Sequence, residues 1–244
     1  MNTKDKVIVI TGASSGIGAE TVRVLAKQHA KLVIGARRIQ RLNALRAEFP
    51  DEQIIVQQVD VTKLNEVQAL IDVALSKFNR IDVLYNNAGI MPVNALVDAD
   101  PEEWRKILEV NVMGVLNGIS AVLPTMIKQQ SGHILATDSV AGHVVVPKYA
   151  VYNGSKFAVR AIMEGLRQEQ QKNHIRTTIV SPGAVHTELY NSIPNEKERQ
   201  AEIETENTIG IAPIHIAEAV AFAINQPDNI DVNEMIIRPI QQSV

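Results

Sequence analysis

Short runs of apolar, mostly β-branched residues alternate with longer stretches of helical periodicity along the whole chain. The run at residues 7–10 is too short and too branched for a helix, so it predicts a buried parallel strand. In the stretch at residues 19–28, Val22, Leu25 and Ala26 fall on one side, as a helix that packs on a sheet requires. The same alternation predicts further strands at residues 32–34, 54–59, 81–85, 133–137, 177–180 and 235–237, and further helices at residues 39–49, 64–78, 101–122, 151–172 and 213–225.

The alternation of strands and helices also predicts how these elements are arranged. Parallel strands need crossover connections, so the sheet should be parallel and covered by helices on both faces. No linker, low-complexity tract or internal repeat interrupts the alternation, so we expect a single domain spanning residues 1–244. The polar stretch at residues 183–210 lacks such periodicity and is expected to be irregular.

Composition and charge narrow the range of functions. Hydrophobic residues make up 45% of the chain, and the formal net charge of −3 gives no reason to expect nucleic acid or an anionic membrane as a partner. The apolar runs are strand-length, so no bilayer-spanning segment is expected, and the short polar segment at residues 1–6 does not resemble a signal peptide. The chain has no cysteine, which excludes disulfides and fits a cytoplasmic protein. No His, Asp or Glu cluster has metal-ligand spacing, so no metal is expected.

Glycines are concentrated between the first predicted strand and the first predicted helix, in the segment Thr11-Gly12-Ala13-Ser14-Ser15-Gly16-Ile17-Gly18. Glycine adopts backbone conformations closed to other residues and lets a phosphate approach the chain. The N-terminus of the following helix offers free N–H groups and a partial positive charge to an anion. The segment therefore predicts a site for a dinucleotide pyrophosphate, and the alternative is a glycine-rich structural turn. It is not a P-loop, because no Lys-Ser/Thr pair follows the last glycine.

The spacing Gly-x-x-x-Gly-x-Gly resembles the glycine loop of the short-chain dehydrogenase/reductase family, and the resemblance recurs in the family's order over roughly residues 6–187. The matching motifs are Asn86-Asn87-Ala88-Gly89, the helix asparagine Asn111, the serine Ser139, the Tyr-x-x-x-Lys pair Tyr152 and Lys156, and Ser181-Pro182-Gly183 followed by Thr187. The resemblance implies a Rossmann-type, doubly wound, three-layer α/β fold with a mainly parallel seven-stranded sheet. It also implies a dinucleotide-binding half at about residues 1–130 and a catalytic half at about residues 131–244.

Tyr152 and Lys156 are four residues apart on a predicted helix, so both side chains point to the same side. Tyrosine alone is a poor base at neutral pH because its pKa is near ~10. A nearby ammonium group favours the phenolate, so Lys156 should lower the pKa of Tyr152. When protonated, the same phenol can donate to a carbonyl oxygen that receives a hydride. The alternative is a surface tyrosine and lysine on an amphipathic helix.

The family resemblance implies a role for each member of this catalytic group. Tyr152 is expected to act as the general acid/base, and Lys156 to lower its pKa and hydrogen-bond the nicotinamide ribose. Ser139 is expected to orient and polarise the substrate oxygen. Asn111 is expected to hold a water that links Lys156 to bulk solvent, and its alternative is a polar kink inside a helix.

The end of the second predicted strand indicates which nicotinamide dinucleotide binds. An acidic residue there binds the ribose 2′-hydroxyl of NAD, whereas an arginine accommodates the 2′-phosphate of NADP. Ala36 stands at this position and is followed by Arg37 and Arg38, whose planar guanidinium groups suit a phosphate. Ser14 and Ser15 stand where many NADP-binding members of the resembled family carry a second basic residue, and their hydroxyls can hydrogen-bond a phosphate. We therefore predict NADP as the cofactor, and the alternative for Arg37 is a solvated basic turn.

The remaining cofactor residues follow from the resemblance. The nicotinamide carboxamide site corresponds to Pro182, Gly183, Val185 and Thr187, the adenosine ribose side to Asn87, Ala88 and Gly89, and the adenine side to Asp60 and Val61. The predicted cofactor set is completed by Gly12, Ser14, Ser15, Gly16, Ile17, Gly18, Arg37, Arg38, Tyr152 and Lys156. For Asp60 the alternative is a helix N-cap or turn residue.

The substrate side is less constrained by the sequence. The resemblance implies a substrate-binding loop at about residues 186–211, from which Tyr190 joins Ser139 and Tyr152 as an expected substrate contact. His143 can donate to a substrate carboxylate, and its alternative is a polar loop residue without a substrate role.

Together these features predict an NADP(H)-dependent oxidoreductase that moves a hydride between the nicotinamide and a small secondary alcohol or carbonyl compound, such as a 3-hydroxy acid. A 3-oxoacyl-carrier-protein reductase is an alternative, although the end of the chain lacks the Gly-rich segment typical of that group. The extended branch of epimerases and dehydratases has a different loop spacing and longer chains. A non-catalytic NADP-sensing regulator is a third alternative, but such proteins usually lose the tyrosine or the lysine. The resemblance also implies a homo-oligomer, a tetramer or a dimer.

Overall fold

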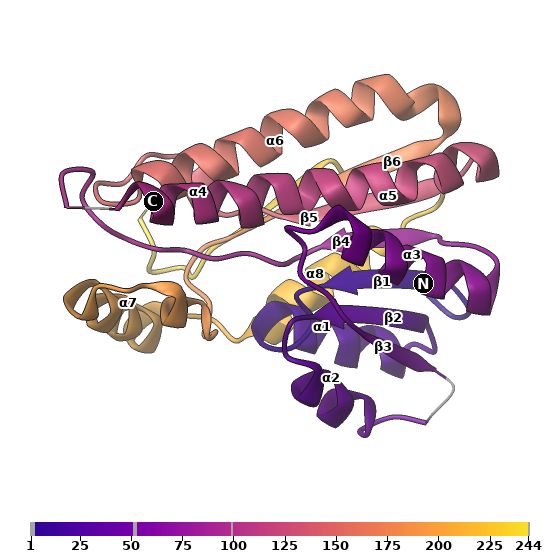
Figure 1. The fold of residues 1–244 in the computed structure, drawn as a ribbon, viewed down its shortest axis with the longest axis horizontal. Helices are drawn as coiled ribbons and strands as arrows, with labels where there is room; N and C mark the ends of the chain where they lie inside the picture. Colours follow the sequence, from indigo (N-terminus) through magenta and orange to yellow (C-terminus); the bar gives the residue numbers. More distant parts are fainter. Residues whose placement is uncertain (1–2, 51–52, 99, 244) are drawn as a thin grey trace.

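The computed structural model describes residues 3–50, 53–98 and 100–243, so the first two residues of the polar N-terminal segment lie outside it. Its centre is a seven-stranded sheet with the strand order β3-β2-β1-β4-β5-β6-β7, in which every strand pair is parallel (Figure 1). The strands are β1 (Val7–Thr11), β2 (Lys31–Ala36), β3 (Ile54–Gln58), β4 (Val83–Asn86), β5 (Gly132–Thr137), β6 (Ile175–Pro182) and β7 (Glu234–Ile237). The predicted doubly wound α/β fold is confirmed. Its strand order reverses between β1 and β4, where the carboxyl ends of the strands open a crevice for a ligand.

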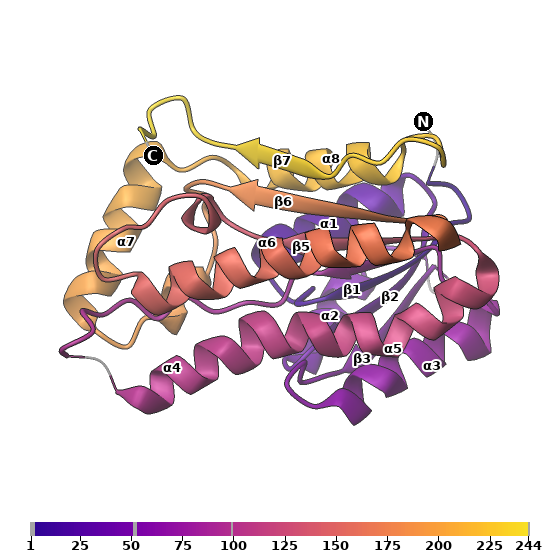
Figure 2. The same ribbon diagram turned by 90° about the horizontal axis from the view of Figure 1, so that it is seen from above.

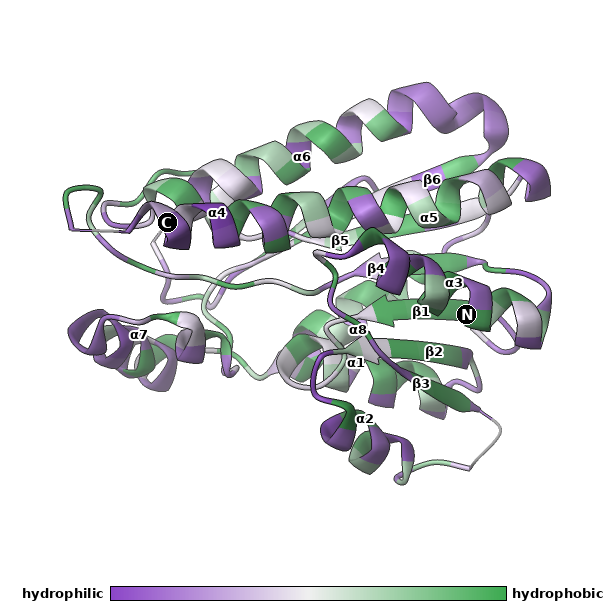
Figure 3. Ribbon diagram, in the orientation of Figure 1, coloured by the Kyte–Doolittle hydropathy of each residue, from purple (hydrophilic) through white to green (hydrophobic). Residues whose placement is uncertain are grey.

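Helices cover both faces of the sheet, as Figures 1 and 2 show. One layer contains α1 (Gly16–Lys27), α2 (Ile39–Arg46) and α8 (Pro213–Ile224), and the other contains α3 (Leu64–Phe78), α4 (Pro101–Leu108), α5 (Gly114–Gln129) and α6 (Ala150–Gln170). The strands alternate between the two cores, because successive side chains point to opposite faces. In β1, Ile8 and Ile10 pack in the first core while Val7 and Val9 pack in the second. Burial on both faces explains why central strands such as β1 and β2 are almost continuously apolar (Figure 3).

The helical stretch that begins at Pro101 is longer than predicted. Asp100 caps it as predicted, because its side chain accepts a hydrogen bond from the backbone N–H of Glu102 at 2.9 Å. The stretch then continues through a π-helical segment (Glu109–Met113) into α5, which ends at Gln129 rather than near residue 122. By length and composition this stretch could cross a membrane, but half of its apolar 18-residue window is buried within the protein, where the stretch packs between α3 and α6 as a core helix.

The prediction of an irregular stretch at residues 183–210 is wrong over its second half. A short 3₁₀ turn (Leu189–Ser192) is followed by α7 (Glu196–Ile209), a hydrophilic helix that lies beside the end of the sheet (Figures 1 and 3). Asn195 caps α7 by accepting from the backbone N–H groups of Lys197 and Glu198. The helix therefore forms without an apolar stripe, since its one buried side chain is Glu206.

Candidate active site

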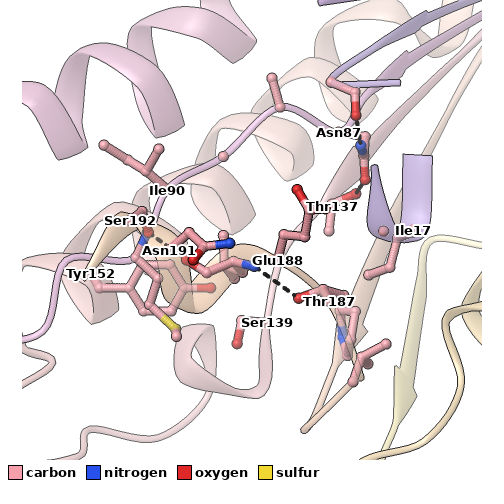
Figure 4. A pocket seen from close by; sticks show the side chains of 18 of the residues that line it. Ile17, Asn87, Ile90, Thr137, Ser139, Tyr152, Thr187, Glu188, Asn191 and Ser192 are labelled. Carbon is pink, nitrogen blue, oxygen red and sulfur yellow. Dashed lines mark hydrogen bonds between the residues drawn. The ribbon is translucent and has the colours of Figure 1, made fainter. Parts of the chain in front are cut away.

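A cavity of about 830 Å³ lies at the carboxyl ends of the strands, beneath α7. Its walls come from the glycine loop, the ends of β2, β4, β5 and β6, the start of α6, and the segment from residue 182 to 206. Figure 4 shows Tyr152 and Ser192 toward one end, Asn87 and Ile17 toward the other, and Ser139 and Thr187 between them. A cavity of this size and position is typical of a small-molecule or cofactor site in an open α/β sheet.

The glycine loop is shaped by backbone contacts that only glycine permits. Gly12 has φ +67°, and a Cβ at this position would lie 2.7 Å from the Cα of Ala88. Gly16 also lies in the left-handed region, at φ +52°, where α1 begins three residues earlier than predicted. A Cβ on Gly18 would lie 2.5 Å from the side-chain nitrogen of Asn87. The loop therefore leaves its backbone open to the cavity, as a pyrophosphate site requires.

Asn87 joins three strand ends beside this loop. Its Nδ2 donates to the carbonyl oxygens of Thr11 at 3.3 Å and Gly12 at 3.2 Å, while its Oδ1 accepts from the hydroxyl of Thr137 at 3.0 Å. Asn87, Ala88 and Gly89 all line the cavity. The Asn87 amide thus fixes the glycine loop of β1 relative to the ends of β4 and β5.

The basic end of the cavity contains the residues predicted to bind a 2′-phosphate. Arg38 donates to the hydroxyl of Ser14 at 3.2 and 3.0 Å and to that of Ser15 at 2.6 Å, and Arg37 lines the same wall. Arg38 also pairs with Glu188 at 2.9 Å, and Arg41 pairs with the same carboxylate at 2.5 Å. Glu188 therefore reaches from the segment after β6 across to the end of β2.

Asp60 and Val61 line the cavity at the end of β3. The Oδ1 of Asp60 accepts from the backbone N–H of Thr62 at 3.1 Å and from its hydroxyl at 2.8 Å. This contact is the turn role considered as the alternative for Asp60. The residue thus combines a turn-forming contact with a position in the cavity wall.

Three of the predicted catalytic residues meet at the other end of the cavity. Tyr152 and Lys156 lie one turn apart on α6, and each is 5% exposed. Ser139 follows β5 and accepts a hydrogen bond from the backbone N–H of Ala141 at 3.1 Å. The ammonium group of Lys156 donates to the carbonyl oxygen of Thr137 at 2.8 Å and lies 5.6 Å from the centre of the Tyr152 ring. The sequence spacing therefore brings a phenol, an ammonium group and a hydroxyl to one place.

The pKa of Tyr152 shifts opposite to our prediction. Burial raises the pKa of Tyr152 above its ordinary value, and the hydrogen bond with Ser139 only partly offsets this effect. The ammonium group of Lys156, which was expected to lower this pKa, donates to the carbonyl of Thr137. The phenol is consequently protonated at neutral pH, which is the form that donates a proton.

Asn111 lies in the π-helical segment and is 2% exposed. Its Oδ1 accepts from the backbone N–H of Ile90 at 2.9 Å, and its Nδ2 donates to the Ile90 carbonyl at 2.9 Å and to the hydroxyl of Ser155 at 3.1 Å. In this structure the amide thus holds the segment after β4 against α6. Its predicted role as a water ligand stays a prediction.

The residues predicted to hold the carboxamide surround the middle of the cavity, namely Pro182, Gly183, Val185 and Thr187. The backbone N–H of Thr187 donates to the carboxylate of Glu206 at 3.0 Å. Burial raises the pKa of Glu206 to about 7, against the lowering effect of this hydrogen bond. The group at the end of α7 is therefore partly protonated at neutral pH.

Two predicted substrate contacts lie outside this cavity. The Nε2 atom of His143 lies 3.0 Å from the hydroxyl of Ser181 and 3.2 Å from the carboxylate of Glu234, because the 3₁₀ turn after Ser139 directs the ring toward β6 and β7. Tyr190 instead lines a smaller pocket beside α1 and α8. Within the described residues, no group of three His, Cys, Asp or Glu side chains is placed to hold a metal ion.

Several cavity residues were not found by sequence reasoning. Tyr149 donates from its hydroxyl to the Glu202 carboxylate at 2.7 Å and contacts the Tyr152 ring edge-on, with ring centroids 6.5 Å apart. Glu188 and Glu206 were also missed. For Glu202 and Glu206 the usable signal was Asn195 followed three residues later by Glu198, a capping-box pattern that predicts a helix start and hence one face bearing residues 198, 202 and 206.

Comparisons with known proteins agree with the doubly wound fold. The model of the short chain dehydrogenase family matches residues 6–198. An oxidoreductase of Staphylococcus saprophyticus, described as uncharacterized, is 53% identical over 245 residues, which cover 100% of this chain and 99% of that protein. A closed form of serine dehydrogenase complexed with NADP+ superposes with a TM-score of 0.92 at 29% identity, covering 98% of this chain and 96% of that one. A 3-ketoacyl-(acyl-carrier-protein) reductase from Brucella melitensis complexed with NADH gives 0.87 at 29% identity, covering 98% and 99%.

Proposed function

Because the chain belongs to the short-chain dehydrogenase family, we propose that it is an NADP(H)-dependent oxidoreductase that acts on a small secondary alcohol or carbonyl compound. The observation that carries this proposal is the arrangement of the cavity. Tyr152, Lys156 and Ser139 line one end, and Ser14, Ser15, Arg37 and Arg38 line the other. A nicotinamide dinucleotide spanning the two would bring its reactive ring beside the phenol.

The chain's own residues supply the proton chemistry. The bound dinucleotide supplies or accepts the hydride. In the direction of reduction, the protonated phenol of Tyr152 donates to the carbonyl oxygen, while the hydroxyl of Ser139 polarises the same oxygen. Tyr152 is in this acid form at neutral pH, as reduction requires. Lys156 provides a fixed positive charge within one helical turn of the phenol.

The choice of NADP rests on the basic end of the cavity. With Ala36 at its last position, β2 itself supplies no carboxylate to bind a ribose 2′-hydroxyl, whereas Arg38 donates to the hydroxyls of Ser14 and Ser15. This arrangement offers a phosphate one guanidinium group and two hydroxyl groups. The neighbouring serine dehydrogenase complexed with NADP+ supports the choice, while the reductase complexed with NADH makes it worth testing directly.

For the substrate, we propose a small carbonyl compound of the 3-oxo acid type or a related ketone. The wall beside Tyr152 is mainly apolar and is formed by Met91, Val144, Val146, Tyr149 and Ile193. The likeness to serine dehydrogenase supports a 3-hydroxy acid as the alcohol. A 3-oxoacyl thioester of a carrier protein is the second candidate, because the chain resembles the 3-ketoacyl reductase almost as closely.

The test is NADPH consumption by the purified protein with β-keto acids, their esters, α-diketones, aldehydes, ketosteroids and acetoacetyl thioesters. Turnover with NADPH that is lost in Tyr152→Phe would support both the catalytic and the cofactor assignment. Tight NADPH binding without turnover of any compound would favour a regulatory nucleotide sensor. Faster turnover with NADH than with NADPH would contradict the role given to the arginines.

We also propose that the protein is a cytoplasmic homo-oligomer, a dimer or tetramer, assembled through the outer face of α4, α5 and α6. Large apolar side chains are exposed on this face, namely Leu108, Met113 and Phe157. Exposed apolar side chains gathered on neighbouring helices favour an interface. Light scattering after size-exclusion chromatography should give a multiple of the chain mass, and Phe157→Glu should reduce it, whereas a wild-type monomer would contradict the proposal.

A further inference from the structure

The last described residues of the chain return to the candidate cofactor site. The backbone N–H of Gly183 donates to the carbonyl of Ile237 at 2.8 Å, so the end of β7 lies beside the end of β6. A turn follows, in which the backbone N–H of Gln242 donates to the carbonyl of Pro239 at 3.0 Å. Gln242 thereby becomes part of the cavity wall, next to Gly183. The predicted cofactor residues end at Thr187, so the sequence gave no indication of this contribution.

The side chain of Gln242 is held by a backbone group of the segment that follows β6. Its Oε1 accepts from the backbone N–H of Ala184 at 2.8 Å. A Cβ at Gly183 would lie 2.0 Å from the same oxygen, so the amide occupies the space that this glycine leaves. Only the oxygen of an amide side chain can accept from an N–H group, so this contact fixes which way the amide faces. Gln242 is therefore oriented by the segment that is predicted to hold the nicotinamide carboxamide.

Further contacts hold the same segment at its next residues. The carbonyl of Ala184 accepts from the backbone N–H of Ile211 at 3.1 Å, and the N–H of His186 donates to the carbonyl of Ile211 at 2.9 Å. Val185, between them, lines the cavity. Within the described residues, the Nε2 of Gln242 has no hydrogen-bond partner. The segment is thus fixed in place, while an amide nitrogen of a cavity-lining residue is left to donate to a ligand.

We propose that Gln242 is a binding residue for the nicotinamide half of the dinucleotide. Its Oε1 anchors the amide on the N–H of Ala184, and its Nε2 donates to the carboxamide oxygen of the nicotinamide. An amide nitrogen donates without bringing a charge, which suits an uncharged carbonyl oxygen. The inference rests on the function proposed above, because it requires a nicotinamide dinucleotide in the cavity. It adds the end of the chain to a site whose other residues all precede α7.

The test compares the two halves of the cofactor by binding alone, without a substrate. NADPH and NADH are titrated by their fluorescence, and 2′,5′-ADP and 5′-AMP, which lack the nicotinamide, by calorimetry. Gln242→Met keeps the length of the side chain but removes both hydrogen bonds, so it should weaken binding of the preferred dinucleotide by about three- to tenfold. The two fragments should bind as they do to the wild-type protein. Gln241→Met, at the exposed neighbouring position, is the matched control and should change no affinity.

Hydrogen exchange follows the anchoring contact itself. The amide of Ala184 should exchange faster in Gln242→Met than in the wild-type protein, even without nucleotide, because its N–H loses the acceptor. Equal dinucleotide affinities in Gln242→Met and the wild-type protein would overturn the proposal. An equal loss of affinity for the dinucleotides and the fragments would also overturn it, because it would indicate a general change in structure. Wild-type protein that binds neither NADPH nor NADH would instead refute the proposed function, and the binding role of Gln242 with it.

Discussion

At the nucleotide end of the cavity, around the glycine loop, close backbone contacts determine the shape. At the substrate end, beside α7, polar side chains determine it. Gly12 approaches Ala88 so closely that no side chain fits, and the strands beneath are buried on both faces. By contrast, α7 buries only Glu206 and is held by hydrogen bonds such as that from Tyr149 to Glu202. A single substitution at the first end disturbs packed backbone, but the second end can change its surface one side chain at a time. The same fold can therefore keep its cofactor while its substrate changes.

The largest expected effect separates chemistry at the substrate end from binding at the nucleotide end. Tyr152→Phe should reduce kcat by about 10²- to 10⁴-fold, because the proton donor is removed, while NADPH affinity stays near that of the wild-type protein. Steady-state rates and NADPH fluorescence titrations measure the two quantities. Tyr190→Phe is the comparison: Tyr190 packs against the cluster around Tyr152 but lines the smaller pocket, so this variant should lower kcat far less. Equal losses of turnover and NADPH binding would remove the distinction between the two ends.

A substitution in the glycine loop should instead weaken NADPH binding at the nucleotide end. Gly12→Ala places a Cβ 2.7 Å from the Cα of Ala88 and forces alanine into the left-handed region, at a cost of about 1–2 kcal/mol or more in unfolding free energy. NADPH should bind about tenfold more weakly or worse, since the loop must shift, and thermal unfolding should begin at lower temperature. Gly165→Ala, with open space at its Cβ in α6, should instead stabilise the protein by up to about 1 kcal/mol. Unchanged NADPH affinity in Gly12→Ala would show that the loop does not form the pyrophosphate site.

Glu188 connects the two ends of the cavity. Its removal should change cofactor affinity less than Gly12→Ala does, and only for NADPH. Its carboxylate pairs with Arg38 and Arg41, where it would compete with the 2′-phosphate of the proposed cofactor for the same guanidinium group. Exposed ion pairs contribute little, so Glu188→Gln should tighten NADPH binding by about two- to fivefold and leave NADH binding unchanged. Titration with 2′,5′-ADP and 5′-AMP isolates the phosphate contribution. Weaker NADPH binding in this variant would mean that Glu188 supports the phosphate site instead of competing with it.

The smallest expected effect concerns stability. Burial raises the pKa of Glu206 to about 7 from an ordinary value of 4.5, so between these values the folded state binds more protons than the unfolded state. The contribution of Glu206 to stability therefore falls as pH rises through this window. Melting temperatures from pH 5 to pH 8 should decline less in Glu206→Gln than in the wild-type protein. Glu204→Gln, at an exposed position on the same helix, should follow the wild-type decline, and a Glu206→Gln profile parallel to it would contradict the assignment.

The two ends also differ in how far the sequence predicts them. Strands such as β1 and helices such as α6 follow from apolar periodicity, and Asp100 follows from its capping chemistry, because each signal is local. The glycine loop and the pair Tyr152 and Lys156 follow from short motifs whose spacing fixes their geometry. The helix α7 was missed because its stability depends on a cap and on polar contacts with distant residues, which periodicity does not detect.

The direction of a loop side chain was equally hard to predict. His143 lies between Ser139 and Tyr152 in the sequence, and proximity to them suggested a place in the cavity. The turn after Ser139 directs its ring to Ser181 and Glu234 instead. Such partners belong to strands that come much later in the chain, so the orientation is decided by tertiary structure. The effect of burial on the pKa of Tyr152 was not predicted for a similar reason, since the depth of burial depends on the assembled fold.

The π-helical segment at Glu109–Met113 determines how α5 is rotated about the helix axis relative to α4. The backbone N–H of Gly114 donates to the carbonyl of Glu109, five residues back, instead of four. Deleting one residue here would restore regular α-helical bonding, yet it would rotate α5 by about 100° relative to α4. Gly114 would then no longer face Val61, and the apolar surface of α5 would turn away from α3. A regular helix would thus lose these packing contacts, so the number of residues between Pro101 and Gln129 is itself a constraint on the fold.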